Sequence, residues 1–360
     1  MRPEGPVSRS FGLGISFYRN WQPALATAKE YAGKLGALRA AVPLLLELDL
    51  EATDRLGDGA PVPEALRSFA AQGWREVRVW TRTTTDDVRQ DWPAGLPNPF
   101  DRGFSYGGIP VRMQALATQA GCEFVVRTDP GCGTPADLPA AIARHLEHIE
   151  RGDADLVSGR YDGRYAIRTD FLPQETSEAH LESRDRLFRL VEAFTRVVPE
   201  HQITGGALTT FPTQGPPTPP FDDVKIVLSD DGFMGTVLGA RAMIDPDTVI
   251  PRSTPGVFLS PHDYAVRLSM MAALDRLWAG RPAANALTAA GAFYRAIGAL
   301  VAEARRAEVD VAAATSAIEG RIDLIARGVE RYQALLIGRW IDCLDVVASR
   351  PDWARATKVI

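Results

Sequence analysis

The stretch Cys122–Tyr161 decides the fold, because two apolar runs flank a turn and a long helical pattern. Cys122–Thr128 (Cys-Glu-Phe-Val-Val-Arg-Thr) is typical of a buried strand, and it stops at the turn-forming cluster Asp129–Gly133 (Asp-Pro-Gly-Cys-Gly). Ala136–Gly152 has the periodicity of an amphipathic helix, and Ala154–Tyr161 predicts the next strand. This strand, helix and strand unit predicts a parallel pair in an α/β domain.

The same alternation extends back towards the start of the chain. The expected strands are Phe11–Phe17, Val42–Asp49 and Glu76–Thr81, and the expected helices are Gln22–Leu35, Pro63–Gln72 and Ile109–Ala120. Asp91–Gly108 is rich in Pro, Gly and Asn and predicts a loop. Residues 11–161 therefore predict an α/β domain with a mixed, mostly parallel sheet flanked by helices.

The pattern changes in the second half of the chain. Residues 211–221 are Pro-rich and predict a loop that could close over a bound substrate. From Pro261 onward the pattern is helical, over Asp263–Ala279, Thr288–Ala307 and Ser316–Ser349. We expect a catalytic domain over residues 1–262 and a helical C-terminal region over residues 263–360. That region either packs on the catalytic domain or provides a self-association face for a homodimer.

Composition excludes several classes of protein. The 360 residues are 46% hydrophobic and 24% charged, which excludes a fibrous repeat, a disordered chain and a disulfide-stapled miniprotein. The net charge of −5 provides no bulk basic surface for nucleic acid. No apolar run approaches the roughly 20 residues that span a bilayer, and no secretory signal pattern is present. With three cysteines, we expect a cytoplasmic protein with reduced thiols, and the Arg- and Ala-rich composition suggests a bacterial source.

Ligands of open α/β sheets bind beyond the carboxyl ends of the strands, so polar residues at those ends are candidate site residues. Asp129 follows a buried strand, and its carboxylate is a ligand type that suits Mg²⁺ or Mn²⁺. A turn-forming role before Pro130 is the alternative. Ser16–Asn20 (Ser-Phe-Tyr-Arg-Asn) follows the first strand and could contact a nucleotide, or it forms an ordinary solvated turn.

Two later clusters are also candidates. Thr204–Ala207 contains paired glycines, which let a backbone approach a ligand closely or form a simple turn. Asp230 and Asp231 follow the apolar run Val224–Leu228 and could orient an acceptor hydroxyl or act as a base. Capping a helix is a compatible role for these two carboxylates.

Three of the five histidines lie at positions that suggest a role. His262 follows another apolar run, and it is either a ligand or a structural residue. His145 and His148 are expected on the solvated polar face of a helix, and their spacing leaves a shared metal site as the alternative.

In this order the clusters resemble those of the nucleotide-diphospho-sugar transferase fold, the GT-A glycosyltransferases. The similarity is to family 2-like or glycosylglycerate-synthase-like members and covers about residues 10–265. The segments that carry it are Gly14–Asn20, Phe124–Asp129, Asp155–Tyr161, Gly205–Ala207 and Asp230–Gly232. The resemblance implies a GT-A, Rossmann-like sheet with a helical C-terminal extension.

The resemblance also implies roles for individual residues. A nucleotide-sugar site would include Ser16, Tyr18, Arg19, Arg127, Asp129, Gly205 and Gly206. Asp129 and His262 would hold a divalent cation, Mn²⁺ or Mg²⁺, and Asp230 and Asp231 would act on the acceptor. The chain departs from the family's Asp-x-Asp motif at Gly131, which leaves the cation requirement open. The substrate's phosphates would then complete the cation site, or arginines would replace the cation; the candidates are Arg127, Arg160, Arg164 and Arg168.

The function that the resemblance implies is transfer of a hexosyl group from a nucleotide-diphosphate sugar to a small-molecule acceptor. A sugar-phosphate nucleotidyltransferase is one alternative. Such enzymes carry a Gly-rich loop after the first strand, whereas Gly12 and Gly14 come before or within that strand here. A chain that binds nucleotide sugars without catalysis is the other alternative, and Gly131 favours it.

Overall fold

The structure is a computed structural model. It describes residues 9–17, 21–48, 62–101, 108–130, 132–161, 208–215, 242–251 and 339–359.

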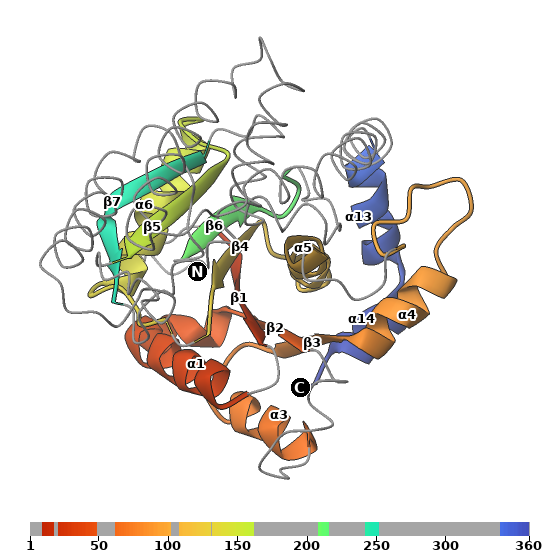
Figure 1. The fold of residues 1–360 in the computed structure, drawn as a ribbon, viewed down its shortest axis with the longest axis horizontal. Helices are drawn as coiled ribbons and strands as arrows, with labels where there is room; N and C mark the ends of the chain where they lie inside the picture. The colour runs from red at the N-terminus through yellow and green to blue at the C-terminus, as the bar shows by residue number, and fades with distance from the viewer. Residues whose placement is uncertain are drawn as a thin grey trace, which may run out of the picture.

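A seven-stranded sheet forms the middle of the fold, in the order β3-β2-β1-β4-β6-β5-β7 (Figure 1). Its strands are β1 (Phe11–Phe17), β2 (Leu44–Leu48), β3 (Val77–Thr81), β4 (Phe124–Thr128), β5 (Leu156–Tyr161), β6 (Thr209–Pro212) and β7 (Ala242–Ile250). β6 runs antiparallel to β4 and β5, and the other four neighbouring pairs are parallel. The prediction of a mixed, mostly parallel sheet is therefore confirmed.

Helices cover both faces of this sheet (Figure 1). They are α1 (Trp21–Leu35), the 3₁₀ helix η1 (Gly36–Ala41), α3 (Val62–Ala70), α4 (Arg82–Gln90), α5 (Ile109–Gln119), α6 (Leu138–Glu150), α13 (Trp340–Ser349) and α14 (Pro351–Thr357). Apolar side chains of α1, α3 and α6 form one core with the sheet, and those of α4, α5, α13 and α14 form a second core on the other face. The result is a three-layer α/β/α domain.

The alternation of residues along β1 explains how the two layers pack. Leu13 and Ile15 belong to the core beneath α1, whereas Gly12 and Gly14 face the other layer. A Cβ at Gly12 would lie 2.6 Å from Leu45 Cδ1, and one at Gly14 would lie 3.0 Å from Met113 Sδ of α5. These two glycines lie inside the strand, and they permit close packing against β2 and α5.

Two segments differ from the sequence-based expectation. Residues 211 and 212 are not loop residues, because they end the strand β6, where Phe211 is 2% exposed and packs in the second core. Residues 213–215 form a turn after this strand, and residues 216–221 of the expected lid lie outside the described residues. Helix α4 was not expected. It begins with a capping box, in which the Thr81 hydroxyl accepts a hydrogen bond from the N–H of Thr84 and the Thr84 hydroxyl accepts one from the N–H of Thr81.

The prediction that His145 lies on a solvated face of its helix is wrong. His145 is fully buried between α6 and the sheet, where its Nδ1 lies 3.0 Å from Thr210 Oγ1 and its Nε2 lies 3.7 Å from Asp245 Oδ2. Burial lowers the pKa of His145 to about 4, despite the neighbouring carboxylate, so the ring is neutral near pH 7. The side of α6 that carries Arg144 and His145 faces β6 and β7, whereas Glu147 is exposed to water, and sequence periodicity cannot distinguish these two polar sides.

The partner of His145 belongs to a buried hydrogen-bonded group on β7. Arg144 Nε donates to Asp245 Oδ2 at 3.0 Å, and Thr248 Oγ1 donates to the same oxygen at 2.5 Å. Burial alone would raise the pKa of Asp245, but these bonds and one from the backbone N–H of Asp247 keep its pKa below the ordinary value. His148 pairs instead with Asp153, so the two histidines do not converge.

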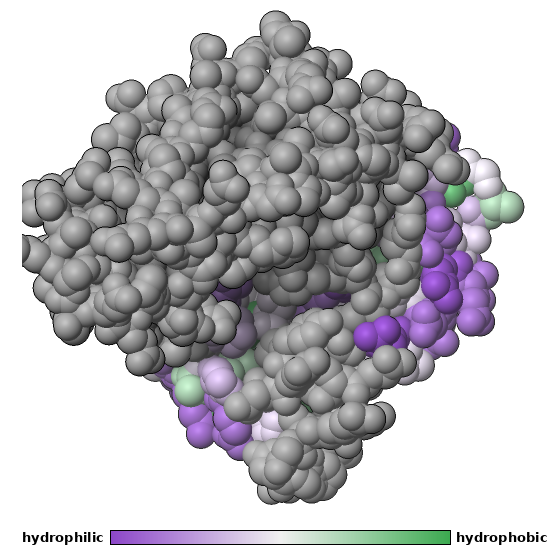
Figure 2. All heavy atoms as spheres, viewed as in Figure 1, coloured by the Kyte–Doolittle hydropathy of each residue, from purple (hydrophilic) through white to green (hydrophobic). Residues whose placement is uncertain are grey.

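The described part of the C-terminal region belongs to the second layer. α13 lies beside α5 through Trp340 and Leu344, and α14 contributes Trp353 to the same core (Figure 1). The side of the molecule where Figure 1 places α4 and α13 is mostly hydrophilic in the space-filling view (Figure 2). Residues 263–338, with the other expected helices, lie outside the described residues. None of the helices described combines the length and the apolar character needed to cross a bilayer.

Candidate active site at the carboxyl edge of the sheet

Six of the seven strands end at the same edge of the sheet, because β6 alone runs in the opposite direction. Asp129 follows β4 directly, so it lies near the middle of that edge. Carboxyl ends of parallel strands are the usual ligand-binding edge of open α/β sheets. The topology therefore makes the surroundings of Asp129 the candidate active site.

Asp129 is held by an arginine that lies beneath it. Arg127 Nη2 donates to Asp129 Oδ1 at 3.3 Å, and the two side chains differ in exposure, 4% for Arg127 and 34% for Asp129. The guanidinium is thus buried in the sheet layer while the carboxylate remains open to a ligand. Arg127 is suited to positioning Asp129, and its own surface for contact with a ligand is small.

The turn that carries Asp129 is fixed against helix α1. The backbone N–H of Thr134 donates to Glu30 Oε1 at 3.1 Å, and Lys34 Nζ donates to the carbonyl of Pro135 at 2.6 Å. Within the turn, the N–H of Cys132 donates to the carbonyl of Asp129 at 3.3 Å. These contacts give Asp129 a rigid support, which a ligand-binding residue needs.

Tyr31 of α1 closes the floor of this turn. Its side chain is fully buried, and burial raises the pKa of Tyr31 well above its ordinary value, with the nearby charges of Glu30 and Asp129 acting in the same direction. Its phenol is therefore neutral at physiological pH and serves as a packing group below the site.

The chain returns to this edge at two further points. Leu208 follows Gly205-Gly206-Ala207 directly, and it has a positive φ of 43°, which is uncommon for a residue with a side chain. The next residue, Thr209, lies opposite Arg127 in the β4–β6 pair. At the end of β7, the carbonyl of Pro251 accepts a hydrogen bond of 2.8 Å from the N–H of Gly133. A Cβ on Gly133 would lie 2.8 Å from that oxygen, so this contact requires glycine.

Three of the predicted site residues are described. Ser16 lies at the end of β1, and because Ile15 is opposite Thr128, Ser16 is adjacent to Asp129 along the edge. Arg127 and Asp129 form the pair above. The other predicted residues lie outside the described ranges; they are Tyr18, Arg19, Gly205, Gly206, Asp230, Asp231 and His262.

A second arginine–carboxylate pair at this edge was not predicted. Glu47 of β2 lies opposite Ser16 of β1, and it forms an ion pair with Arg112 in the first turns of α5. Their exposures are 2% and 1%, so the pair is completely buried. A charged residue within the apolar run Leu44–Leu48 was the available signal, because a buried charge needs a partner.

The described residues do not complete a metal site. Among them, no group of three or more His, Cys, Asp or Glu side chains converges on one point. The half-exposed carboxylate of Asp129 has the oxygen chemistry that Mg²⁺ and Mn²⁺ prefer, so it fits as one ligand. A site built from three or more such side chains would need residues from outside the described ranges.

Comparison with solved structures finds similar chains. One is the mannosyltransferase PcManGT from Pyrobaculum calidifontis, in complex with GDP-Man and Mn²⁺, with 17% identity and a TM-score of 0.47 over 98% of this chain and 87% of that one. Glucosyl-3-phosphoglycerate synthase from Mycobacterium tuberculosis, with Mg²⁺ and UDP, has 13% identity and a TM-score of 0.35 over 84% and 82%. TarS of S. aureus has 12% identity and a TM-score of 0.40 over 79% and 43%.

The sheet topology of the described residues shows a mixed, mostly parallel α/β domain, which is the fold class that the sequence predicts. No protein-family model matches the chain, and no curated protein matches it. At identities below 25% and TM-scores below 0.5, the structural similarities do not indicate what this chain binds.

Proposed function

We propose that the protein is a glycosyltransferase that moves a hexosyl group from a nucleotide-diphosphate sugar to a small-molecule acceptor. The observation that carries the proposal is Asp129, a half-exposed carboxylate on a rigid turn at the centre of the ligand-binding edge. The order of the motifs along the chain, which resembles that of GT-A glycosyltransferases, supports the same function.

The charges at the edge suggest how the donor would be held. During transfer, the bond between the anomeric carbon and the diphosphate oxygen breaks, and negative charge builds on the leaving diphosphate. A carboxylate beside a diphosphate needs a cation between them, and Arg127 is too deeply buried to fill that position. Asp129, with His262 as the proposed second protein ligand, would hold a divalent cation that neutralises this charge.

The N-terminus of α5, which lies near the carboxyl edge of the sheet, also favours an anionic ligand. α5 begins at Ile109, and its residue Arg112 reaches Glu47 near the carboxyl end of β2, so the first turns of the helix lie close to this edge. Helix N-termini carry partial positive charge and favour anions. The Glu47–Arg112 pair would fix this helix end relative to Ser16, which we place in the nucleotide site.

The proposed acceptor residues are Asp230 and Asp231. A carboxylate near the acceptor hydroxyl could take up its proton as the new glycosidic bond forms, or could orient sugar hydroxyls. Gly205 and Gly206 are proposed to line the donor site, and the described chain resumes at this edge two residues after Gly206.

A protein that binds nucleotide sugars without catalysis is the second candidate, because Gly131 leaves Asp129 as the single carboxylate of the motif. The nucleotidyltransferase alternative has less support. Gly12 and Gly14 lie inside β1 against Leu45 and Met113, where they cannot form a phosphate-binding loop after the strand.

One experiment separates these functions. UDP- and GDP-sugars are titrated into the protein with and without Mn²⁺, and product release is then followed with a panel of small acceptors. Release of a nucleoside diphosphate that requires both acceptor and Asp129 supports transfer. Binding without release would identify a binding protein, and release of pyrophosphate from a nucleoside triphosphate would identify a nucleotidyltransferase.

A further inference from the structure

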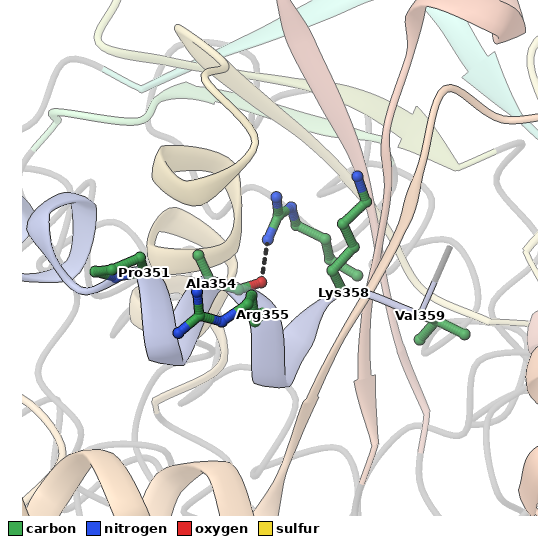
Figure 3. A pocket seen from close by; sticks show the side chains of 6 residues that line it. Pro351, Ala354, Arg355, Lys358 and Val359 are labelled. Carbon is green, nitrogen blue, oxygen red and sulfur yellow. Dashed lines mark hydrogen bonds between the residues drawn. The ribbon is translucent and has the colours of Figure 1, made fainter.

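A groove on the outer edge of the sheet lies away from the proposed donor site. The last described residues lie alongside β3, since the N–H of Val359 donates to the carbonyl of Val77 at 2.9 Å and Lys358 forms an antiparallel bridge with Arg78. The groove has a volume of about 480 Å³; it is lined by Arg78, Pro351, Ala354, Arg355, Lys358 and Val359 (Figure 3). α14 and its end form one wall, and β3 forms the other.

Arg78 forms the floor of the groove, and one of its three guanidinium nitrogens has no hydrogen-bond partner among the described residues. It is 7% exposed, and its Nη1 donates to the carbonyl of Ala354 at 2.9 Å, the contact drawn as a dashed line in Figure 3. Its Nη2 lies 3.0 Å from Glu76 Oε2. Its Nε–H has no hydrogen-bond partner among the described residues. A buried donor without an acceptor is costly, and the guanidinium of Arg78 therefore keeps part of its hydrogen-bonding capacity unused beside the groove.

The charge in the groove is positive. Arg355 and Lys358 are exposed, and Arg355 forms no ion pair with any described residue. Lys358 Nζ lies 3.7 Å from Glu76 Oε2, at the edge of ion-pair distance. In the described part of the chain, Glu76 is the single carboxylate paired with these cations, and it also pairs with Arg75. Two of the three lining cations, Arg78 and Lys358, therefore share one carboxylate with Arg75, so the groove carries an excess of positive charge.

We propose that this groove binds the phosphate group of a small organic phosphate. A phosphate dianion offers three acceptor oxygens, which suit the three cationic side chains that line the groove, the guanidinium groups of Arg78 and Arg355 and the ammonium of Lys358. The apolar side chains of Pro351, Ala354 and Val359 provide the surface for the organic part. A ligand bound here bridges α14 and β3, and it stabilises the native state because the unfolded chain has no such site.

The groove is separate from the donor site. β3 and β4 are three strand positions apart in the sheet, which corresponds to about 14 Å at the usual strand spacing. Arg78 is also near the amino end of β3, whereas Asp129 lies beyond the carboxyl end of β4. The proposal therefore does not depend on the proposed transferase function.

The test titrates the full chain with inorganic phosphate and, separately, with glycerol phosphate, at constant ionic strength. Calorimetry measures the dissociation constant and thermal denaturation measures the stabilisation. We expect both probes to bind, and we expect the Arg355→Gln/Lys358→Gln variant to raise both dissociation constants at least about tenfold, because two charge-assisted contacts are lost. Tighter binding of glycerol phosphate than of inorganic phosphate would show that the organic part is also recognised.

Two control variants make the result specific. Arg151→Gln/Arg339→Gln removes the same two positive charges from exposed positions elsewhere, and it should leave phosphate binding unchanged. Asp129→Asn should also leave it unchanged. The proposal is overturned if the groove variant and the charge control behave alike, if sodium chloride stabilises as much as phosphate, or if phosphate binding depends on Asp129 and not on Arg355 and Lys358.

Discussion

Two arginine–carboxylate pairs lie at the same edge of the sheet, and they differ in exposure. Arg112 and Glu47 are each no more than 2% exposed, whereas the side chain of Asp129 is 34% exposed above a buried Arg127. Both members of the first pair are closed to a ligand, so its role is to hold α5 against β2. The second pair presents one open carboxylate from a fixed position. The difference separates a structural group from a group that can bind, although the residue types are the same.

Breaking the buried pair should have the largest effect. Arg112→Met leaves the Glu47 charge buried without its main partner, and we expect a loss of about 3–5 kcal/mol in the free energy of unfolding, measured in urea. The double variant Glu47→Leu/Arg112→Met should be more stable than this single variant, because no charge then remains uncompensated. If Arg112→Met is as stable as the wild type, the Glu47–Arg112 pair is not a structural pair, and it does not differ from the Arg127–Asp129 pair in the way described.

Asp129→Asn tests the open pair. We expect turnover of the donor to fall by about 10²–10³-fold, the size typical of losing one electrostatic contact in the transition state. Stability should change by no more than about 1 kcal/mol, because Asn keeps an oxygen acceptor for Arg127 at a partly solvated position. Steady-state kinetics and urea denaturation of the same preparation measure both. A large loss of stability with normal turnover would show that Asp129 is structural, like Glu47.

His145 is a third kind of ionisable group, one that is buried like Glu47 but neutral. Its pKa is about 4 in the folded protein and about 6.5 when unfolded, so the unfolded state binds more protons between these values. The contribution of His145 to the free energy of unfolding is therefore complete above about pH 6.5. It falls as the pH decreases towards 4, by roughly 3 kcal/mol in total.

The variant His145→Gln keeps a polar side chain but cannot titrate. Urea denaturation between pH 4 and 7 should show a smaller dependence on pH in this variant than in the wild type. Equal slopes would mean that His145 is not the group responsible.

An exposed pair should show the smallest effect. Arg339 and Asp342 are each about half exposed and are paired across one helical turn. Asp342→Asn should therefore change stability by at most about 0.5 kcal/mol, and it should not affect donor turnover. It is the matched control for Asp129→Asn, because both replace a partly exposed aspartate that is paired with arginine.

The strands and helices of the first half were predictable because their periodicity matches their burial. Leu13 and Ile15 alternate with Gly12 and Gly14 across β1, and β4 begins with the apolar run Phe124–Val126. α4 was missed since Arg82–Gln90 is almost entirely polar, and only the capping residues Thr81 and Thr84 signal its start. β7 was not predicted either, because Asp245 and Pro246 interrupt it with turn-like residues.

The candidate site was only partly predictable. Asp129 was identified because a carboxylate after a buried strand can be recognised locally. Its support from Glu30, Lys34 and Pro251 depends on contacts between residues that are far apart in the chain. The Glu47–Arg112 pair joins residues 65 positions apart, which one sequence cannot reveal. The roles of Asp230, Asp231 and His262 stay predictions.

Donor titration tests the central claim most directly. Wild type, Asp129→Asn and Asp342→Asn are titrated with UDP- and GDP-sugars in the presence of Mn²⁺, and the dissociation constants are measured by calorimetry. We predict that at least one nucleotide sugar binds to the wild type and to Asp342→Asn with equal affinity, and at least about tenfold more weakly to Asp129→Asn, a change of 1.4 kcal/mol or more. Equal binding to all three proteins, or binding to none, would contradict the placement of a nucleotide-sugar site at Asp129.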